Sequence, residues 1–148
     1  MKKYVKTIGI ASDHAGFTMK EAIKKYLELH SVEVTDFGTH SLESMDYPDV
    51  AHPLATAVEN GTFPFGIALC GSGNGISMTL NKHQGIRAAL CWNKELSQLA
   101  RQHNDANILT MPARFIDEKT ALEIVDVFLT TNFEGGRHLK RVNKIRCN

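Results

Sequence analysis

One cysteine of the sequence stands where a thiolate could move protons. Cys70 ends the short apolar run 65–70 and directly precedes a glycine-rich loop, Gly71-Ser-Gly-Asn-Gly75. Successive glycines let backbone N–H groups turn toward a bound anion, and a helix expected from Ile76 adds its positive N-terminal end. The same field favours an ionised thiol. The pattern indicates an anion cradle beside a reactive thiol, although a cysteine at the end of an apolar strand is more often a small buried hydrophobe.

The spacing within this loop disfavours three familiar uses of a glycine-rich turn. A dinucleotide-binding fingerprint needs a third glycine where Ile76 stands. A cysteine phosphatase loop needs an arginine at that same position, and a P-loop needs a lysine directly after Gly75. Zinc is disfavoured as well, because the cysteines have no paired spacing with each other or with histidine; they are Cys70, Cys91 and Cys147.

Other polar residues have both a functional and a structural interpretation. Asp13 and His14 follow the first apolar run, where they could bind a ligand, but Asp13 could equally cap the next helix. His103 stands near the expected end of a helix, where a histidine commonly interacts with the helix dipole. Arg137 and Arg141 are four residues apart, so on a helix they share one face. That face is either a phosphate clamp or an ordinary solvated basic surface.

Short apolar runs alternate with longer amphipathic stretches along the chain. We expect strands near 5–11, 32–37, 65–70, 86–91 and 107–110, and helices near 17–29, 48–61, from 76 onward, 94–103 and 117–131. This alternation predicts a doubly wound, Rossmann-like α/β fold, with a five-stranded parallel sheet and helices on both faces. In such sheets ligands bind beyond the carboxyl ends of the strands, near the reversal of strand order. Asp13, His14 and Cys70 fall at that edge.

Composition narrows the class of protein. The 148 residues fit one domain, expected to span residues 1–148, and 43% hydrophobic residues suffice for one core. A formal charge of +1 gives no overall field to attract nucleic acid or an anionic membrane. No apolar run approaches the roughly 20 residues of a membrane helix, and the first residues lack the apolar core of a signal peptide. Three widely spaced cysteines fit reduced thiols, so we expect a cytoplasmic protein.

Several motifs occur in a fixed order along nearly the whole chain. They are Ser12-Asp-His-Ala-Gly16, Asp46-Tyr-Pro48, Cys70-Gly-Ser-Gly-Asn-Gly-Ile76, Asn81-Lys82, Gly85-Ile-Arg-Ala88, Arg101-Gln-His-Asn-Asp105 and Glu134-Gly-Gly-Arg-His138. This set resembles the ribose-5-phosphate isomerase B family, which shares its scaffold with galactose-6-phosphate isomerase subunits and an allose-6-phosphate isomerase. The resemblance implies an enzyme that interconverts ribose 5-phosphate and ribulose 5-phosphate without a metal or organic cofactor.

The resemblance also implies roles for the loop residues. Cys70 would carry a proton between C1 and C2 of the sugar through an enediolate, as in the members of the family that have this cysteine. Ser72 stands where the family commonly has threonine, so the hydroxyl is kept and a methyl group is lost. The backbone N–H groups of the loop would hold the enediolate oxygen. The loop residues are Gly71, Ser72, Gly73, Asn74 and Gly75.

Residues outside the loop receive roles from the same resemblance. His103 would act as the acid and base that opens the furanose ring of the sugar. Contacts to the sugar hydroxyls are implied for Asp13, Tyr47 and Asn104. Contacts to the phosphate are implied for His14, Arg114, Arg137 and Arg141.

Topology predicts that one subunit cannot supply both Cys70 and His103 to a single site. In a parallel βαβ unit each strand runs toward the ligand-binding edge and each helix runs back, so His103 should lie at the edge opposite Cys70. A strand spans about 17–20 Å, whereas an acid or base acts over ~3 Å. We therefore expect a homodimer with shared active sites, or a tetramer built from such dimers.

Two alternatives to the pentose phosphate reaction remain at this stage. The same residues could isomerise a hexose 6-phosphate, either allose or galactose 6-phosphate. A non-catalytic module could instead bind a phosphosugar through the arginines while the Cys70 thiol is structural.

Overall fold

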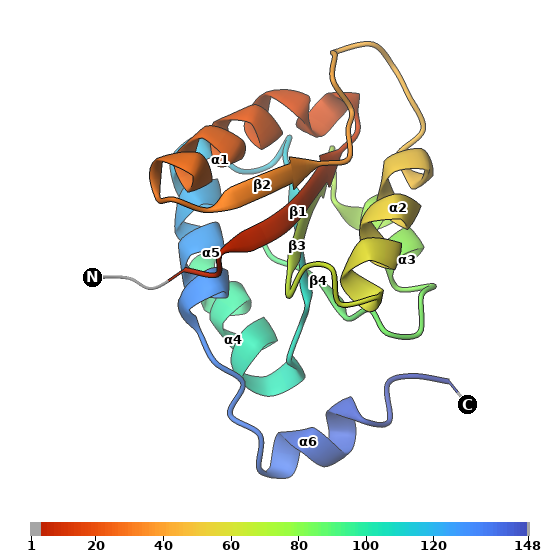
Figure 1. Cartoon of the computed structure of the whole chain (residues 1–148), viewed down its shortest axis with the longest axis vertical. Coiled ribbons are helices and arrows are strands. Elements are labelled where there is room, and N and C mark those ends of the chain that lie inside the picture. The colour runs from red at the N-terminus through yellow and green to blue at the C-terminus, as the bar shows by residue number, and fades with distance from the viewer. Residues whose placement is uncertain (1–3, 148) are drawn as a thin grey trace.

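The computed structural model describes residues 4–147 and contains one parallel sheet (Figure 1). Its five strands lie in the order β2-β1-β3-β5-β4. The strands are β1 (Thr7–Ser12), β2 (Glu33–Asp36), β3 (Gly66–Cys70), β4 (Ala88–Leu90) and β5 (Ile108–Pro112). Every neighbouring pair of strands is parallel. The predicted doubly wound α/β fold is confirmed.

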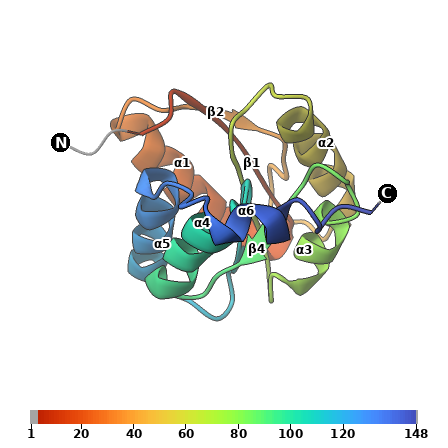
Figure 2. The same cartoon turned by 90° about the horizontal axis from the view of Figure 1, so that it is seen from below.

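Helices cover both faces of the sheet. The face on the left of Figure 1 carries α1 (Phe17–Leu29), α4 (Lys94–Asn104) and α5 (Glu118–Thr130), and the opposite face carries α2 (Pro48–Glu59) and α3 (Asn74–Leu80). Seen from below, the short helix α6 (Arg137–Val142) lies across the lower end of the molecule (Figure 2). No helix within residues 4–147 is long and apolar enough to cross a membrane.

Alternating side chains of the central strands divide the core in two. Ile67 and Leu69 of β3 pack into the cluster beneath α1, α4 and α5, whereas Ala68 and Cys70 pack into the cluster beneath α2 and α3. Successive residues of a strand point to opposite faces, so a strand buried on both sides is apolar at nearly every position. Cys70 thus lies on the α2 and α3 side of the sheet, with its side chain among core residues.

Several elements differ from their expected bounds by one or two residues, and in α3 and β4 the fold gives the reason. Helix α3 begins at Asn74, two residues before the expected Ile76, because Gly73 takes the turn with a left-handed backbone (φ 78°) and frees the next residue to enter the helix. Strand β4 has three residues rather than the expected run 86–91. Strand β4 is an edge strand, and the side-chain amide of Asn81 bonds to its first residue. Asn81 Oδ1 accepts from Ala88 N–H at 2.8 Å, and Asn81 Nδ2 donates to Ala88 O at 3.0 Å. This side chain caps the unpaired edge of the sheet.

The order of the strands places a ligand-binding edge between β1 and β3. The chain moves outward from β1 to β2 and then crosses to β3 on the other side, so the strand order reverses between β1 and β3. Ser12 of β1 is in register with Leu69 of β3, and Cys70 with Pro112 of β5. The segments after these residues therefore leave the sheet at one edge, the upper edge in Figure 1. Helix α6 lies at the lower edge.

Candidate active site

A cavity of about 570 Å³ opens at the upper edge of the sheet. Its walls come from the segment after β1, the loop that leads into α2, the residue after Cys70 and the segment after β5. The lining residues are Asp13, His14, Ala15, Met45, Asp46, Tyr47, Pro48, Asp49, Gly71 and Arg114. The volume suits a small phosphorylated metabolite. Four residues expected to bind substrate, Asp13, His14, Tyr47 and Arg114, thus meet in one cavity.

Asp13 and His14 are held by the short 3-10 turn His14–Gly16 that precedes α1. Asp13 is 7% exposed, its N–H donates to Leu69 O at 3.2 Å, and its Oδ1 accepts from Gly16 N–H at 3.1 Å. Asp13 therefore does cap a helix, but it caps the 3-10 turn rather than α1. A Cβ at Gly16 would lie 2.8 Å from the Cβ of Leu69, so the turn requires glycine there. The side chain of Asp13 therefore both caps the turn and lines the cavity.

His14 fastens the loop that closes one side of the cavity. Its Nδ1 accepts a hydrogen bond from Met45 N–H at 3.2 Å. A ring nitrogen that accepts carries no proton, so the proton of the imidazole is on Nε2. His14 therefore supports the loop through one nitrogen and keeps the other as a donor for an anionic ligand.

The start of the same loop is anchored by a buried ion pair. Lys20 of α1 is fully buried, and its Nζ lies 2.5 Å from Asp36 Oδ2, with Lys24 Nζ 2.9 Å from the same oxygen. Burial alone would raise the pKa of Asp36, but the hydrogen bonds from Lys20, Lys24 and Gly38 N–H together hold it below its usual value. Asp36 therefore stays ionised and fixes the chain where it leaves β2. The next residues bond to β1, since Ser12 N–H donates to Gly38 O at 2.7 Å.

Cys70 lies directly beneath this cavity, at the end of β3. It is 5% exposed, and the residue after it lines the cavity. Ala113 N–H donates to Cys70 O at 2.9 Å, and Arg114 N–H donates to Gly71 O at 3.0 Å. A Cβ at Gly71 would meet the Arg114 Nη1 at 3.3 Å, so the guanidinium rests against this glycine. The backbone pairing places a positive charge beside the thiol-bearing turn.

The other two cysteines have different surroundings. Burial raises the pKa of the Cys91 thiol to about 12, so this thiol stays protonated at neutral pH. Cys147 is exposed near the C-terminal end. Cys70 alone among the three cysteines adjoins the cavity and its polar residues.

The glycine loop is shaped by one left-handed turn and by local hydrogen bonds. A Cβ at Gly73 would lie 2.4 Å from a methyl carbon of Leu90, so both the space and the positive φ require glycine. Ser77 Oγ donates to Gly73 O at 2.6 Å and fixes the turn. The hydroxyl of Ser72 accepts from Asn74 N–H at 3.3 Å. One of the N–H donors expected to hold an oxyanion is therefore already engaged by Ser72.

Tyr47 reaches across the cavity to the far end of this loop. A Cβ at Gly75 would lie 2.4 Å from Tyr47 Cζ and 2.6 Å from its hydroxyl oxygen. Gly75 has an ordinary backbone conformation for any residue, since its φ is not among the positive values of the chain. The glycine is therefore required by the tyrosine ring, which packs directly on the backbone.

Gly75→Ala is expected to displace the Tyr47 ring and to raise KM for the substrate by about tenfold, the loss of roughly one hydrogen bond. A double-mutant cycle measures this, with Tyr47→Ala as the second change. In the Tyr47→Ala background the space is open, so Gly75→Ala should add little further effect. Equal effects of Gly75→Ala in both backgrounds would contradict a contact between loop and ring.

The remaining candidate residues lie at the lower edge of the sheet. His103 and Asn104 end α4, and Arg137 and Arg141 belong to α6, which packs on α4. Both arginines and Asn104 are exposed, and His103 is half-buried. Exposure is compatible with a phosphate clamp and with an ordinary basic face. The predicted separation of His103 from Cys70 is present: they lie at opposite ends of the strands.

Arg101 holds the end of α4 against the segment that precedes α6. Its buried guanidinium donates to Thr131 O at 3.2 Å, Ala106 O at 2.6 Å and Asp105 Oδ1 at 2.9 Å. It also lies over the rings of Phe65 and Phe128, with distances of 4.7 and 5.7 Å to the centroids. These contacts fix the end of α4 against the segment that leads to α6.

Two further side chains lie next to His103, and neither was assigned a role from the sequence. The rings of His103 and His138 stack with centroids 4.2 Å apart, and Glu134 Oε1 lies 3.8 Å from His103 Nε2 and 3.6 Å from His138 Nε2. The four-residue spacing of Glu134 and His138 is the one indication in the sequence. It could not be linked to His103 without knowing how α6 packs.

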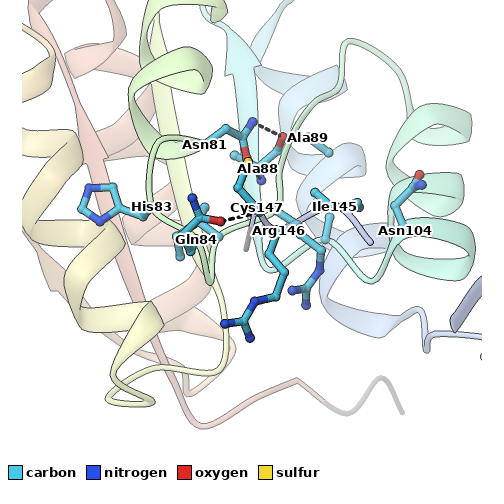
Figure 3. A pocket seen from close by; sticks show the side chains of 12 residues that line it. Asn81, His83, Gln84, Ala88, Ala89, Asn104, Ile145, Arg146 and Cys147 are labelled. Carbon is cyan, nitrogen blue, oxygen red and sulfur yellow. Dashed lines mark hydrogen bonds between the residues drawn. The ribbon is translucent and has the colours of Figure 1, made fainter. Parts of the chain in front are cut away.

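A second cavity, of about 370 Å³, adjoins this lower group (Figure 3). Asn104 stands on one side of it, and the residues around Asn81 and His83 stand on the other. The tail after α6 passes between them, where Cys147 N–H donates to Gln84 Oε1 at 2.7 Å. Of the candidate residues at the lower edge, Asn104 lines this cavity.

Comparisons with known proteins show the family of the chain. Residues 8–145 match the model of the ribose/galactose isomerase family. Ribose-5-phosphate isomerase B of Escherichia coli is 45% identical over 141 residues, which are 95% of each chain. The crystal structure of a ribose 5-phosphate isomerase from Thermotoga maritima superposes with a TM-score of 0.93 at 50% identity and covers 95% of this chain and 97% of that one.

A further solved structure carries a ligand. Ribose-5-phosphate isomerase B from Mycoplasma genitalium, solved with bound ribulose-5-phosphate, is 42% identical with a TM-score of 0.90 and covers 94% of this chain and 93% of its own. The match extends over nearly the whole length of both chains in each case. The chain therefore belongs to the ribose/galactose isomerase family.

Proposed function

We propose that this chain, as a single domain of residues 1–148, interconverts ribose 5-phosphate and ribulose 5-phosphate. The observation that carries the proposal is the upper cavity, in which Asp13, His14, Tyr47 and Arg114 converge beside the turn that follows Cys70. A relative of the same fold, from Mycoplasma genitalium, was solved with bound ribulose-5-phosphate. The three unpaired thiols suit a reducing compartment such as the cytoplasm.

The chemistry requires a base that moves a proton between two neighbouring carbons. Cys70 takes a proton from C2 of the open-chain aldose and returns it to C1 of the enediolate, which yields the ketose. The N–H groups of Gly71 and Gly73 hold the developing oxyanion, while the hydroxyl of Ser72 fixes the loop through Asn74 N–H. The proposed mechanism assigns no step to a metal or organic cofactor, and the net isomerisation consumes no external electrons.

Substrate contacts divide between the two edges of the sheet. At the upper edge Asp13 and Tyr47 contact the sugar hydroxyls, and His14 and Arg114 face the phosphate. His103, Asn104, Arg137 and Arg141 act from the lower edge, where His103 opens the furanose ring and the arginines hold the phosphate. Both sets meet only if the lower edge of a second subunit faces the upper cavity. The working unit is then a homodimer, or a tetramer built from such dimers.

An assay on three sugar phosphates tests the proposal. Ribose 5-phosphate, allose 6-phosphate and galactose 6-phosphate are compared by kcat/KM, with the Cys70→Ala variant as a background. The proposal expects the highest kcat/KM with ribose 5-phosphate. Preference for a hexose 6-phosphate would reassign the substrate, and no turnover of any of the three would refute the isomerase.

The two arginines of α6 give a separate prediction for phosphate recognition. Arg137→Ala and Arg141→Ala each remove a charge-assisted hydrogen bond worth roughly 1.5–3 kcal/mol. The inhibition constant of inorganic phosphate as a competitive inhibitor should therefore rise by about 10- to 100-fold. Lys140→Ala, on the same exposed helix, is the matched control and should change the constant little. If the inhibition constant of phosphate is unchanged in both arginine variants, Arg137 and Arg141 belong to a solvated basic face and do not bind phosphate.

A further inference from the structure

We propose that His103, Glu134 and His138 form a binding site for a divalent transition-metal ion such as Zn²⁺, and that the bound ion inhibits the enzyme. We call these three residues the lower-edge cluster. Their candidate ligand atoms all lie within 4.8 Å of one another. Two imidazole nitrogens and one carboxylate oxygen are a ligand set that zinc uses widely in proteins.

The distances within the lower-edge cluster are close to those of a bound ion. Tetrahedral zinc with bonds of about 2.0–2.1 Å places its ligand atoms about 3.3 Å apart. Glu134 Oε1 lies 3.6 Å from His138 Nε2 and 3.8 Å from His103 Nε2. The rings of His103 and His138 stack with an interplanar angle of 14°, so one ring must turn out of the stack before both nitrogens point at one ion. The exposed carboxylate of Glu134 can follow. Half-exposure of His103 and Glu134 leaves the fourth position open to water.

The charges around the lower-edge cluster limit its affinity for a cation. Arg137 and Arg141 lie close enough to His138 to act on it electrostatically. The same two arginines repel a cation, so the site should be of moderate affinity. We therefore expect the ion to bind reversibly as an inhibitor and not to be a permanent structural component.

The backbone of the lower-edge cluster is held in place before any ion binds. Glu134 N–H donates to Gln102 O at 3.0 Å, which joins the segment before α6 to the last turn of α4. His138 is 8% exposed, and its N–H donates to Gly135 O at 3.0 Å. The backbone positions of the three ligands, which come from α4, α6 and the segment before α6, are thus fixed near one another, so only side chains have to be ordered when an ion binds.

Inhibition follows from the place of His103 and rests on the proposed function. A metal bound to His103 Nε2 holds the imidazole that the proposed function uses to exchange a proton with the sugar ring. The expectation of a reaction without a metal cofactor is unaffected, because the ion would block the reaction rather than assist it. Zinc was disfavoured on the spacing of the cysteines with each other and with histidine, and the lower-edge cluster contains no cysteine.

Calorimetric titration with Zn²⁺ tests the site independently of activity. All proteins carry Cys147→Ser, which removes the exposed thiol. We expect one ion per chain, and at least about tenfold weaker binding in Glu134→Gln, since even groups that only orient metal ligands contribute about 10- to 100-fold. His138→Gln provides a second variant with the same expected loss. His52→Gln is the matched control, because His52 bonds to His83 at 2.7 Å in a different cluster.

Unchanged zinc affinity in both Glu134→Gln and His138→Gln, or loss of binding in His52→Gln alone, would overturn the site. The effect on turnover is measured separately with ribose 5-phosphate: zinc should inhibit the parent protein and inhibit Glu134→Gln at least about tenfold less strongly. If zinc acted at Cys70, it would inhibit the two proteins equally. That result would overturn the proposal that zinc inhibits through the lower-edge cluster. If no sugar phosphate is turned over, the proposed function fails while the calorimetry still decides the metal site.

Discussion

Cys70→Ala is expected to lower kcat for ribose 5-phosphate by about 10³ or more, because it removes the proposed proton carrier. The affinity for inorganic phosphate should stay nearly the same, since the proposed phosphate contacts are made by His14 and the arginines. The substitution deletes one sulfur atom in a core region already lined by Ala11 and Ala68. A loss of activity would therefore report on chemistry rather than on a collapsed site. The measurement is steady-state kinetics together with the phosphate inhibition constant.

Cys91→Ala is the matched control for this prediction. Cys91 is also a buried cysteine, 1% exposed, but burial raises its pKa to about 12 and it lies in the opposite core cluster. It should cost some stability and leave kcat unchanged. Activity of Cys70→Ala within tenfold of the parent protein would exclude the thiolate as the proton carrier. A similar fall in both variants would point to packing damage.

Local patterns in the sequence predicted most of the elements because each follows from short-range periodicity. The apolar strands β1, β3 and β5 and the helices between them appear within a few residues of their expected bounds. The exceptions depend on the fold. Strand β4 is short because it has one neighbour, and α3 starts early because Gly73 turns the chain. Neither the neighbour of a strand nor the φ of a glycine can be read from hydrophobic spacing.

In the candidate site, too, positions that follow from local sequence could be predicted, and contacts between distant segments could not. Cys70 and Asp13 could be placed at one edge because both directly follow strands of a parallel sheet. The contact of Tyr47 with Gly75 and the bond from Met45 N–H to His14 join segments that are distant in sequence. The packing of α6 on α4 created the lower-edge cluster in the same way. Such contacts follow from tertiary packing, for which the sequence offered no periodic signature.

The position of His103 was predicted from the direction in which α4 runs. That direction separates His103 from Cys70 within one subunit. Helix α4 runs from Lys94 down to Asn104, and β5 then starts at Ile108 in register with Gly66, the first residue of β3. Cys70 is the last residue of β3. The thiol and the imidazole are thus separated by the length of a strand, about 17 Å for five residues. A proton-transfer group must come within ~3 Å of its target.

Mixing the inactive variants Cys70→Ala and His103→Ala under conditions of subunit exchange is therefore expected to restore activity. In a heterodimer with composite sites, one site carries both substitutions and the other carries neither. Random exchange makes half of the dimers heterodimers, so the mixture should regain about a quarter of the parent activity. Activity is followed against time after mixing, and heterodimer formation is measured by mass spectrometry of the intact dimers.

A mixture of His103→Ala with Arg137→Ala provides the control, because both residues lie at the lower edge. Every composite site in that heterodimer receives one damaged lower edge, so activity should stay at the level of the separate variants. Restoration in this control would mean that subunit exchange stabilises the variants without rebuilding a site. Absence of restoration in the Cys70 and His103 mixture, with heterodimers present, would remove His103 from the site that holds Cys70. The sugar ring would then have to be opened by a group of the upper cavity, where His14, with its proton on Nε2, is the nearest donor to test.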